Sequence, residues 1–173
     1  MTQGELQGEQ QGGPDHEAAR RRLDEIQRQM PDLVEKLLAC EPHSRDRRPA
    51  APDLAGVYLF SEDGAHRYVG RTRSFNRRFG EHVAPKSSQN KAAFAFNIAR
   101  ANAAAEGVAI AGTRDEVEAL PQFEPYFTAA KHRVRTMEFR FVEIDDPALS
   151  TVFEVYASIA LHTEGEFNLF ETH

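Results

Sequence analysis

Two short sequences with tyrosine at one end carry the side chains best suited to chemistry. Gly-Val-Tyr at 56–58 and Tyr-Val-Gly at 68–70 place two phenols ten residues apart, and Arg78 and His82 follow them. Cleaving a phosphodiester requires an activated nucleophile, positive charge beside the phosphate and stabilisation of the leaving oxygen. Phenol, imidazole and guanidinium groups can supply the first two, so this pattern indicates a phosphodiester-cleaving site.

Two polar side chains near the end of the chain are candidates to complete this site. Glu154 is the only acid between Asp146 and Glu164, and Asn168 follows at a position where a turn residue would also fit. One carboxylate, together with water and phosphate oxygens, is enough to hold magnesium, because that ion keeps much of its hydration. Glu154 is therefore the candidate metal ligand.

The two tripeptides are expected to lie on the strands of a β-hairpin. Gly56–Phe60 and His66–Gly70 are short aromatic and β-branched runs, separated by five residues that contain an Asp-Gly turn signal. A symmetric five-residue loop would place Tyr58 opposite Tyr68. Residues paired in this way share one face of the sheet, so both phenols could act on one substrate. A slip of one residue would separate them.

The basic segment after the hairpin predicts a helix over Ser74–Val83. Its apolar stripe at a spacing of four is formed by Phe75, Phe79 and Val83. At 100° per residue, Arg78 and His82 flank this stripe, whereas Arg77 falls on the far side. We therefore expect Arg78, rather than Arg77, to reach a site beside the sheet.

Before the hairpin, the pattern predicts two helices and a linker. Asp15 can cap a helix over Glu17–Met30, and Pro31 interrupts the pattern and can begin a second helix, Pro31–Ala39. The expected organisation is a disordered tail at 1–14, a helical segment at 15–40, a linker at 41–53 and a domain at 54–173 with a helical insertion at about 87–135.

The remaining segments read as helices and a third strand. Helices are expected at Gln89–Glu106, after Thr113, at Pro125–Arg135 and at Leu149–His162, with a strand at Glu138–Ile144. In the last helix, the expected apolar face consists of Val152, Val155, Tyr156 and Ile159. Glu154 lies opposite that face, where an exposed side chain is normal.

In these positions the chain resembles the GIY-YIG nuclease family, in which two short strands carry the tripeptides and the next helix carries the catalytic arginine. Both tripeptides match, and Arg78, His82, Glu154 and Asn168 follow in the family's order over about 115 residues. The resemblance implies an α/β (α+β) fold, a small three-stranded antiparallel sheet flanked by helices, here with an N-terminal helical extension.

The resemblance also implies a one-metal hydrolytic mechanism. Tyr58 would act as general base or orient the attacking water, Tyr68 would assist, Arg78 would bind the scissile phosphate, His82 would relay protons and Glu154 would hold Mg²⁺ or Mn²⁺. The residues expected to contact substrate are Gly70, Arg71, Arg73 and Asn168. A phenol with a pKa of about 10 is a poor base at neutral pH, so this role requires the cationic field of Arg71 and Arg78.

The charge distribution supports a nucleic-acid partner, and DNA is the partner expected. The formal net charge is −6, yet residues 56–100 hold eight Lys or Arg against three Asp or Glu, a local excess of five positive charges. Residues 101–173 hold five against thirteen. Binding to phosphates should therefore be confined to one basic face and be sensitive to salt.

Composition suggests a cytoplasmic protein with no membrane association. The chain has no apolar run of about 18 residues, and its first fourteen residues lack the pattern of a secretory signal. The single cysteine, Cys40, cannot form an internal disulfide.

Two other functions fit the same residues. Either phenol alone could be an ordinary half-buried strand residue, and Glu154 an ordinary surface charge, which would leave an inactive nucleic-acid-binding or protein-interaction module. Alternatively, the N-terminal helices could bind another protein and make this chain the nuclease subunit of a larger assembly. Metal-dependent endonuclease activity on DNA remains the leading hypothesis because the set of residues is complete.

Overall fold

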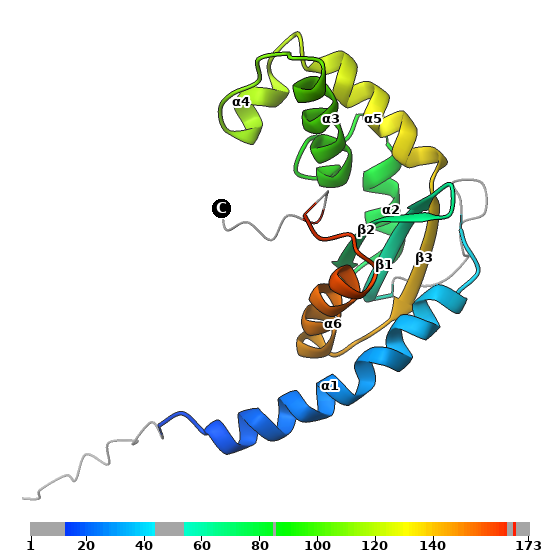
Figure 1. Cartoon of the computed structure of the whole chain (residues 1–173), viewed down its shortest axis with the longest axis vertical. Helices are drawn as coiled ribbons and strands as arrows, with labels where there is room; N and C mark the ends of the chain where they lie inside the picture. The colour runs from blue at the N-terminus through cyan, green and yellow to red at the C-terminus, as the bar shows by residue number, and fades with distance from the viewer. Residues whose placement is uncertain (1–12, 44–53, 85, 166–167, 169–173) are drawn as a thin grey trace, which may run out of the picture.

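The centre of the molecule is a three-stranded antiparallel sheet. A computed structural model of the chain describes residues 13–43, 54–84, 86–165 and 168. The strands β1 (Gly56–Glu62), β2 (Ala65–Thr72) and β3 (Glu138–Glu143) lie in the order β2-β1-β3 (Figure 1). Helices cover both faces of the sheet and a long helix precedes it, so the predicted fold is confirmed.

The turn of the hairpin is shorter than the sequence suggested. Asp63 and Gly64 have φ angles of 52° and 77°, and they form a two-residue turn that closes on the Glu62–Ala65 pair. Aspartate and glycine tolerate the left-handed backbone that this turn requires. The expected five-residue loop is therefore wrong.

A β-bulge next to this turn sets which residues share a face. One extra residue in β2 lets Phe60 pair with Tyr68 and Tyr58 pair with Gly70, so the predicted Tyr58–Tyr68 pair is wrong by two positions. A shift of two keeps both phenols on one face, and their ring centroids are 6.2 Å apart. If the register of the turn continued without the bulge, Tyr68 would lie opposite Leu59, on the other face.

The face that carries the phenols is covered by the helix after the hairpin and by the helices of the insertion. These are α2 (Phe75–Val83), α3 (Ala93–Ala105) and α5 (Glu124–Thr136), and the short α4 (Arg114–Glu118) joins α3 to α5 (Figure 1). The core on this face is mainly aromatic and includes Tyr58, Phe60, Phe75, Phe79, Phe94, Phe96, Phe123 and Phe139. Phe94 and Phe96 of α3 have no exposed surface.

The predicted helix starts are close to those observed, with one shift. Thr113 forms a capping box with Glu116 at the start of α4, as its position suggested. By contrast, α3 begins at Ala93 instead of Gln89. The reason is a tertiary contact: Gln89 is buried and hydrogen-bonded to Asp115 and Glu118 of α4.

The opposite face is covered by α1 (His16–Ala39) and α6 (Pro147–Ala160). The shared core there contains Ile26, Met30, Leu33 and Leu37 of α1, Val57, Leu59 and Val69 of the sheet, and Phe153 and Ala157 of α6. Alternate residues of β1 therefore enter two different cores, which explains why the whole strand is buried apart from its last residue.

The first helix is continuous, so the predicted break at Pro31 is wrong. Pro31 lies inside the 24-residue helix α1. Proline removes the donor to the carbonyl of Gln27, but Gln27 is exposed and water can replace that donor. Buried Met30 and Leu33 on either side of the proline hold the helix on the domain.

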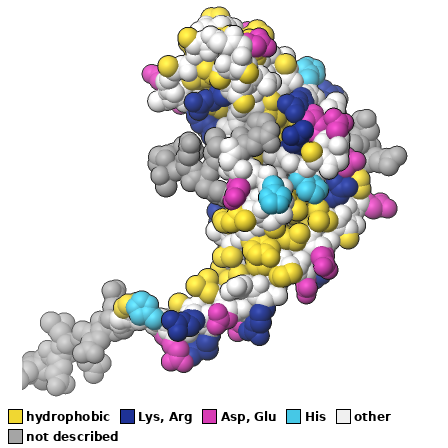
Figure 2. Space-filling view, viewed as in Figure 1, with side chains coloured by type: hydrophobic (Ala, Val, Ile, Leu, Met, Phe, Trp, Pro, Cys, Tyr) yellow, Lys and Arg dark blue, Asp and Glu magenta, His cyan; other side chains and the backbone are white. Residues whose placement is uncertain are grey.

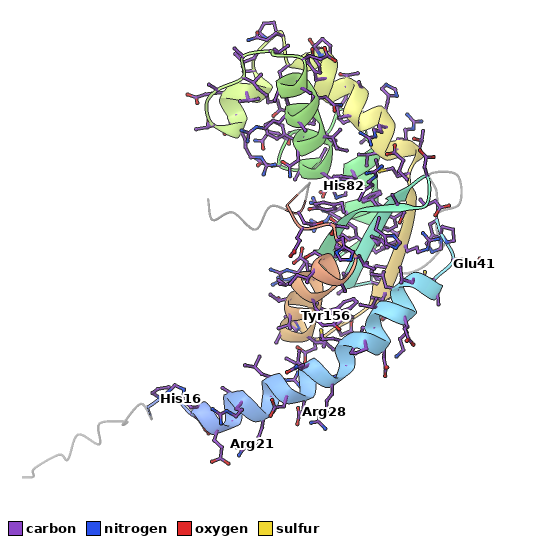
Figure 3. All side chains as sticks on the ribbon, in the orientation of Figure 1. His16, Arg21, Arg28, Glu41, His82 and Tyr156 are labelled. Carbon is purple, nitrogen blue, oxygen red and sulfur yellow. The ribbon has the colours of Figure 1, made fainter. Side chains whose placement is uncertain are left out.

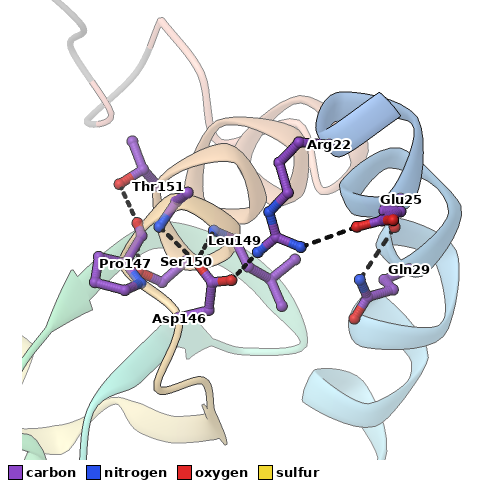
Figure 4. A network of polar contacts seen from close by, with 9 residues as sticks. Arg22, Glu25, Gln29, Asp146, Pro147, Leu149, Ser150 and Thr151 are labelled. Atoms are coloured by element: carbon purple, nitrogen blue, oxygen red, sulfur yellow. Dashed lines mark hydrogen bonds and ion pairs between the residues drawn. The ribbon is translucent and has the colours of Figure 1, made fainter. Parts of the chain in front are cut away.

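An ion-pair network ties the N-terminal half of α1 to the start of α6 (Figure 4). Arg22 contacts both Glu25 of its own helix and Asp146, whose carboxylate caps α6 through the backbone N–H groups of Ala148 and Leu149. By contrast, Arg21 and Arg28 point into solvent from α1 (Figure 3). Within the described residues, no helix has the length and apolar character needed to cross a membrane.

Candidate active site

The hydroxyl of Tyr58 is the point where the predicted site residues meet. Its oxygen lies 3.0 Å from Nε2 of His82 and accepts a hydrogen bond of 3.2 Å from Nε of Arg78. Both partners come from α2, one helical turn apart, as the helical phase of the sequence predicted. His82 lies inside the molecule between the sheet and the insertion (Figure 3).

Gly70 makes room for the Tyr58 ring. A Cβ atom at Gly70 would lie 2.5 Å from both Cζ and Oη of Tyr58. The phenol of the central strand therefore lies directly over the glycine of the edge strand, with its hydroxyl toward the edge of the sheet. Gly70 was expected from the sequence to contact substrate, and in the structure it shapes the position of a catalytic candidate.

The two tyrosines differ in exposure. Tyr58 has no exposed surface, whereas Tyr68 is partly exposed and stacks on Phe94 of α3 with 4.6 Å between ring centroids and 13° between planes. Burial raises the pKa of Tyr68, and the positive charge of Arg78 opposes that increase. Tyr68 is thus the more exposed of the two side chains.

Burial dominates the electrostatics around Tyr58 and His82. Burial, and then the neighbouring Tyr68, raise the pKa of Tyr58, while Arg78 acts in the opposite direction and does not prevail. The pKa of His82 is well below its ordinary value because of burial and the charge of Arg78. The resting pair is therefore a neutral phenol beside a neutral imidazole, which can accept the phenol proton at Nε2. The cationic field expected to activate Tyr58 is weaker than burial.

Glu154 lies on the α6 side of the sheet and contacts β2. Its Oε2 accepts a hydrogen bond of 2.8 Å from Nε of Arg71, and 21% of its side chain is exposed. Burial raises the pKa of Glu154, and the Arg71 charge lowers it. Arg71 precedes Thr72 at the end of β2 and points to the face opposite Tyr58, so the site spans both faces at one edge of the sheet.

The apolar face predicted for the last helix is wrong, and the correction explains the position of Glu154. The buried residues of α6 are Ser150, Phe153, Ala157 and Ser158, whereas Val155, Tyr156 and Ile159 are exposed. Tyr156, labelled on α6 in Figure 3, is 37% exposed. Glu154 follows buried Phe153, at the margin of the packed face, and this brings it beside β2.

Asn168 binds the backbone of the edge strand. Its Oδ1 accepts a hydrogen bond of 2.8 Å from the N–H of Val69, and its Nδ2 donates to the carbonyl of Val69. The side chain therefore pairs with β2 as another strand would. Asn168, expected to contact substrate, is placed to hold the strand that carries Tyr68 and Gly70.

An open pocket of about 400 Å³ adjoins these residues and is lined by four arginines. They are Arg71, Arg73, Arg77 and Arg78, with Glu81 and Asp145 as the acids of the lining. Arg77 was predicted to face away from the site, yet it lines the same pocket. Its side chain is exposed, and the pocket also includes Arg71, Thr72 and Arg73 at the end of β2. The run of arginines after Gly70 was the sequence signal for this residue.

Arg78 is restrained at one end and available at the other. Besides its bond to Tyr58, its Nη1 donates 3.0 Å to the carbonyl of Lys91 and lies 3.4 Å from Glu81. Nη2 has no hydrogen-bond partner among the described residues. This guanidinium is thus oriented toward the pocket with a free edge that suits a phosphate oxygen.

The donor set fits a lightly ligated divalent cation. Within the described part of the chain, no group of three or more His, Cys, Asp or Glu residues is arranged to hold a metal. A zinc-type cage is therefore excluded for those residues, whereas Glu154 with water and phosphate oxygens matches the ligand preference of Mg²⁺.

Comparison with known proteins adds a family. Residues 54–148 match the family model of the GIY-YIG catalytic domain, a segment that includes both tripeptides, Arg78 and His82 and ends before Glu154. Neither the curated proteins nor the solved structures compared with this chain gave a match.

Proposed function

Because the chain belongs to the GIY-YIG family, whose catalytic domain is a nuclease-type fold, we propose that it is a metal-dependent endonuclease that hydrolyses phosphodiester bonds in DNA. The observation that carries this proposal is the contact of Arg78 and His82 with one phenol oxygen beside a pocket lined by arginines. A binding module would need the pocket alone. It would not need this buried cluster, in which Nδ1 of His82 has no hydrogen-bond partner among the described residues, at a cost in free energy.

Phosphate recognition is assigned to the pocket. Nη2 of Arg78 would bind a non-bridging oxygen of the scissile phosphate, and Arg73 and Arg77 would contact its neighbours. Fixed guanidinium groups stabilise the charge that develops on a phosphorane-like transition state. Arg78 is the best placed because its hydrogen bonds to Tyr58 and Lys91 hold it in one orientation.

Proton transfer is assigned to the tyrosines and His82. The attacking water would be oriented by Tyr68, which is the partly exposed phenol, and would lose a proton toward the Tyr58–His82 pair. The hydroxide oxygen then forms a bond to phosphorus while the bond from phosphorus to the leaving oxygen breaks, and that oxygen takes a proton from solvent. Tyr58 acts as a hydrogen-bonded relay in this scheme, because burial disfavours a free tyrosinate.

Glu154 would hold Mg²⁺ or Mn²⁺, and the ion would neutralise charge on the phosphate and the leaving oxygen. In the structure, Nε of Arg71 donates a hydrogen bond to Oε2 of Glu154. Arg71 would have to release this oxygen, or share it with the metal ion, when substrate binds. A phosphate in the pocket offers Arg71 an alternative anion.

One observation favours the alternative of an inactive binding module on the same fold. Tyr58 has no exposed surface, and a substrate could not reach its hydroxyl without rearrangement. A protein of this second kind would bind DNA through the arginine pocket and would not cut it.

Cleavage of defined nucleic acids separates the two functions. Pure protein is incubated with supercoiled plasmid, single-stranded DNA and structured RNA, each with Mg²⁺, Mn²⁺ or EDTA. Glu154→Ala is expected to lower the rate by about 10³-fold, because it removes the metal ligand, whereas Glu35→Ala on the exposed side of α1 should leave it unchanged. DNA binding by the wild-type protein without metal-dependent nicking would favour the inactive module.

A further inference from the structure

Two arginines of the insertion lie outside the pocket, and Asn97, which hydrogen-bonds one of them, is three residues before the other on α3. Arg100 is on α3, and Arg114 begins α4. The charge of Arg100 acts on Arg114, and neither guanidinium forms an ion pair with a carboxylate in the part of the chain that the structure describes. Two like charges side by side repel each other unless an anion joins them.

Arg114 is held in a fixed orientation. Its guanidinium carbon lies 4.9 Å from the centroid of the Phe96 ring, and its Nη2 donates 3.1 Å to Oδ1 of Asn97. Stacking and this hydrogen bond fix the plane of the group, and its other N–H donors have no partner among the described residues. An immobilised arginine loses little further entropy when it binds an anion.

The same helix connects these arginines to the active-site candidates. Phe94, which stacks on Tyr68, precedes Asn97 by three residues on α3. Three residues are about one turn of an α-helix, so Phe94 and Asn97 lie on one side of α3. The charge of Arg114 also reaches the Tyr68 phenol, which places the two groups within electrostatic range.

Figure 2 shows Lys and Arg side chains on the hollowed side of the molecule, where the insertion overhangs the sheet. This arrangement leaves basic groups on both sides of Tyr68: the arginine pocket at the ends of the strands, and the pair on the insertion.

We propose that Arg100 and Arg114 form a second phosphate-binding site, which holds the DNA backbone beside the scissile phosphate. This inference rests on the proposed function only in taking DNA as the ligand. The two arginines are positioning residues: they stabilise the bound substrate and do not touch the reacting atoms. Their removal should weaken binding and leave the rate of the chemical step unchanged.

Binding measured without cleavage tests this site. A fluorescein-labelled 30-base-pair duplex is titrated in EDTA with the full chain and with R100Q/R114Q, at several salt concentrations. The double variant is expected to bind about tenfold more weakly, with a slope of log K against log salt reduced by roughly 1.8, because two phosphate contacts are lost. R21Q/R28Q removes two exposed charges from α1 and should change neither quantity (Figure 3).

The outcomes separate this site from the proposed enzyme activity. R100Q alone changes an exposed side chain, so a parallel, smaller loss of affinity in R100Q excludes misfolding as the cause. If R100Q/R114Q bound the duplex with the affinity and salt slope of R21Q/R28Q, the proposed site would be overturned. A wild-type protein that does not bind the duplex would also overturn it. A protein that binds through these arginines yet never cuts DNA would keep this inference and remove the nuclease proposal. With an active enzyme, single-turnover rates at saturating DNA should match the wild type.

Discussion

At the scale of single residues, burial changes the pKa values in the site more than the neighbouring charges do. Tyr58 lies between Arg78 and His82, a setting in which the sequence alone suggests a phenol activated by positive charge. Burial exceeds the effect of the arginine, so the pKa of Tyr58 rises. A sequence reveals which charges are near in the chain, but desolvation depends on every element that packs over the group. This is why the residues of the cluster could be predicted and their protonation states could not.

His82 should make the stability of the protein depend on pH. Its pKa in the folded protein lies well below the ordinary value of about 6.5, so the unfolded chain binds a proton that the folded chain rejects. Stability from this residue is complete above pH 6.5 and falls as the pH drops below it, by at most about 1.4 kcal/mol per pH unit. Urea unfolding of wild type and His82→Gln at pH 5 to 8 measures this slope.

The glutamine variant keeps a polar group near Tyr58 and does not titrate, so its unfolding free energy should fall less steeply at acidic pH. His132→Gln changes an exposed histidine and serves as the control. Parallel pH profiles for wild type and His82→Gln would contradict the neutral, buried state of this imidazole.

At the scale of elements, the two glycines of the tripeptides have different neighbours. A Cβ at Gly56 would lie 2.0 Å from the carbonyl oxygen of Val142, a backbone atom of β3. A Cβ at Gly70 would instead meet the Tyr58 ring. One glycine therefore permits the pairing of strands, and the other permits the placement of a side chain.

This difference predicts different failures for the two alanine variants. Gly56→Ala should destabilise the fold by about 3 kcal/mol, because β3 must move. Gly70→Ala should lower the cleavage rate by about 10²-fold with a smaller loss of stability, because it displaces the Tyr58 hydroxyl. Thermal unfolding and plasmid nicking measure the two effects. Gly13→Ala, where a Cβ meets no neighbour, is the control, and equal losses of stability in both variants would contradict the assignment.

The elements themselves were largely predictable, and the errors share a cause. Local patterns identified the hairpin, α2, the Thr113 cap and the last helix. They did not identify the bulge, because any residue can occupy one, nor the continuity of α1 through Pro31, because that depends on packing against α6 and the sheet. The wrong apolar face of α6 has the same origin: Val155, Tyr156 and Ile159 are hydrophobic yet exposed.

At the scale of the whole molecule, α1 is part of the core on one face of the sheet. Its C-terminal half supplies Leu37, which has no exposed surface, to the cluster that contains Val57 and Phe153. The N-terminal half extends beyond the domain and is connected to α6 through Arg22 (Figures 1 and 4). Removal of α1 would therefore expose the core that it shares with the sheet and α6.

Substitutions of two neighbouring leucines test this role of α1. Leu37→Ala should lower the free energy of unfolding by about 3 kcal/mol, because it leaves a cavity in the core. Leu38 is 39% exposed, so Leu38→Ala should cost less than about 1 kcal/mol. Chemical denaturation measures both. Similar small losses would show that α1 is attached only loosely.

The bulge in β2 has a consequence for protein engineering. The strand pairs between the turn and Tyr68, including the bulge, determine on which face each side chain lies. The length of the turn therefore does not affect the faces of the two tyrosines. A reporter peptide inserted between the exposed Asp63 and Gly64 should leave both phenols in place. A single residue inserted between His66 and Tyr68 would instead turn one phenol to the α6 side. An insertion at the hairpin tip can therefore carry a label, whereas an insertion between the tip and Tyr68 changes the face of the sheet on which that tyrosine lies.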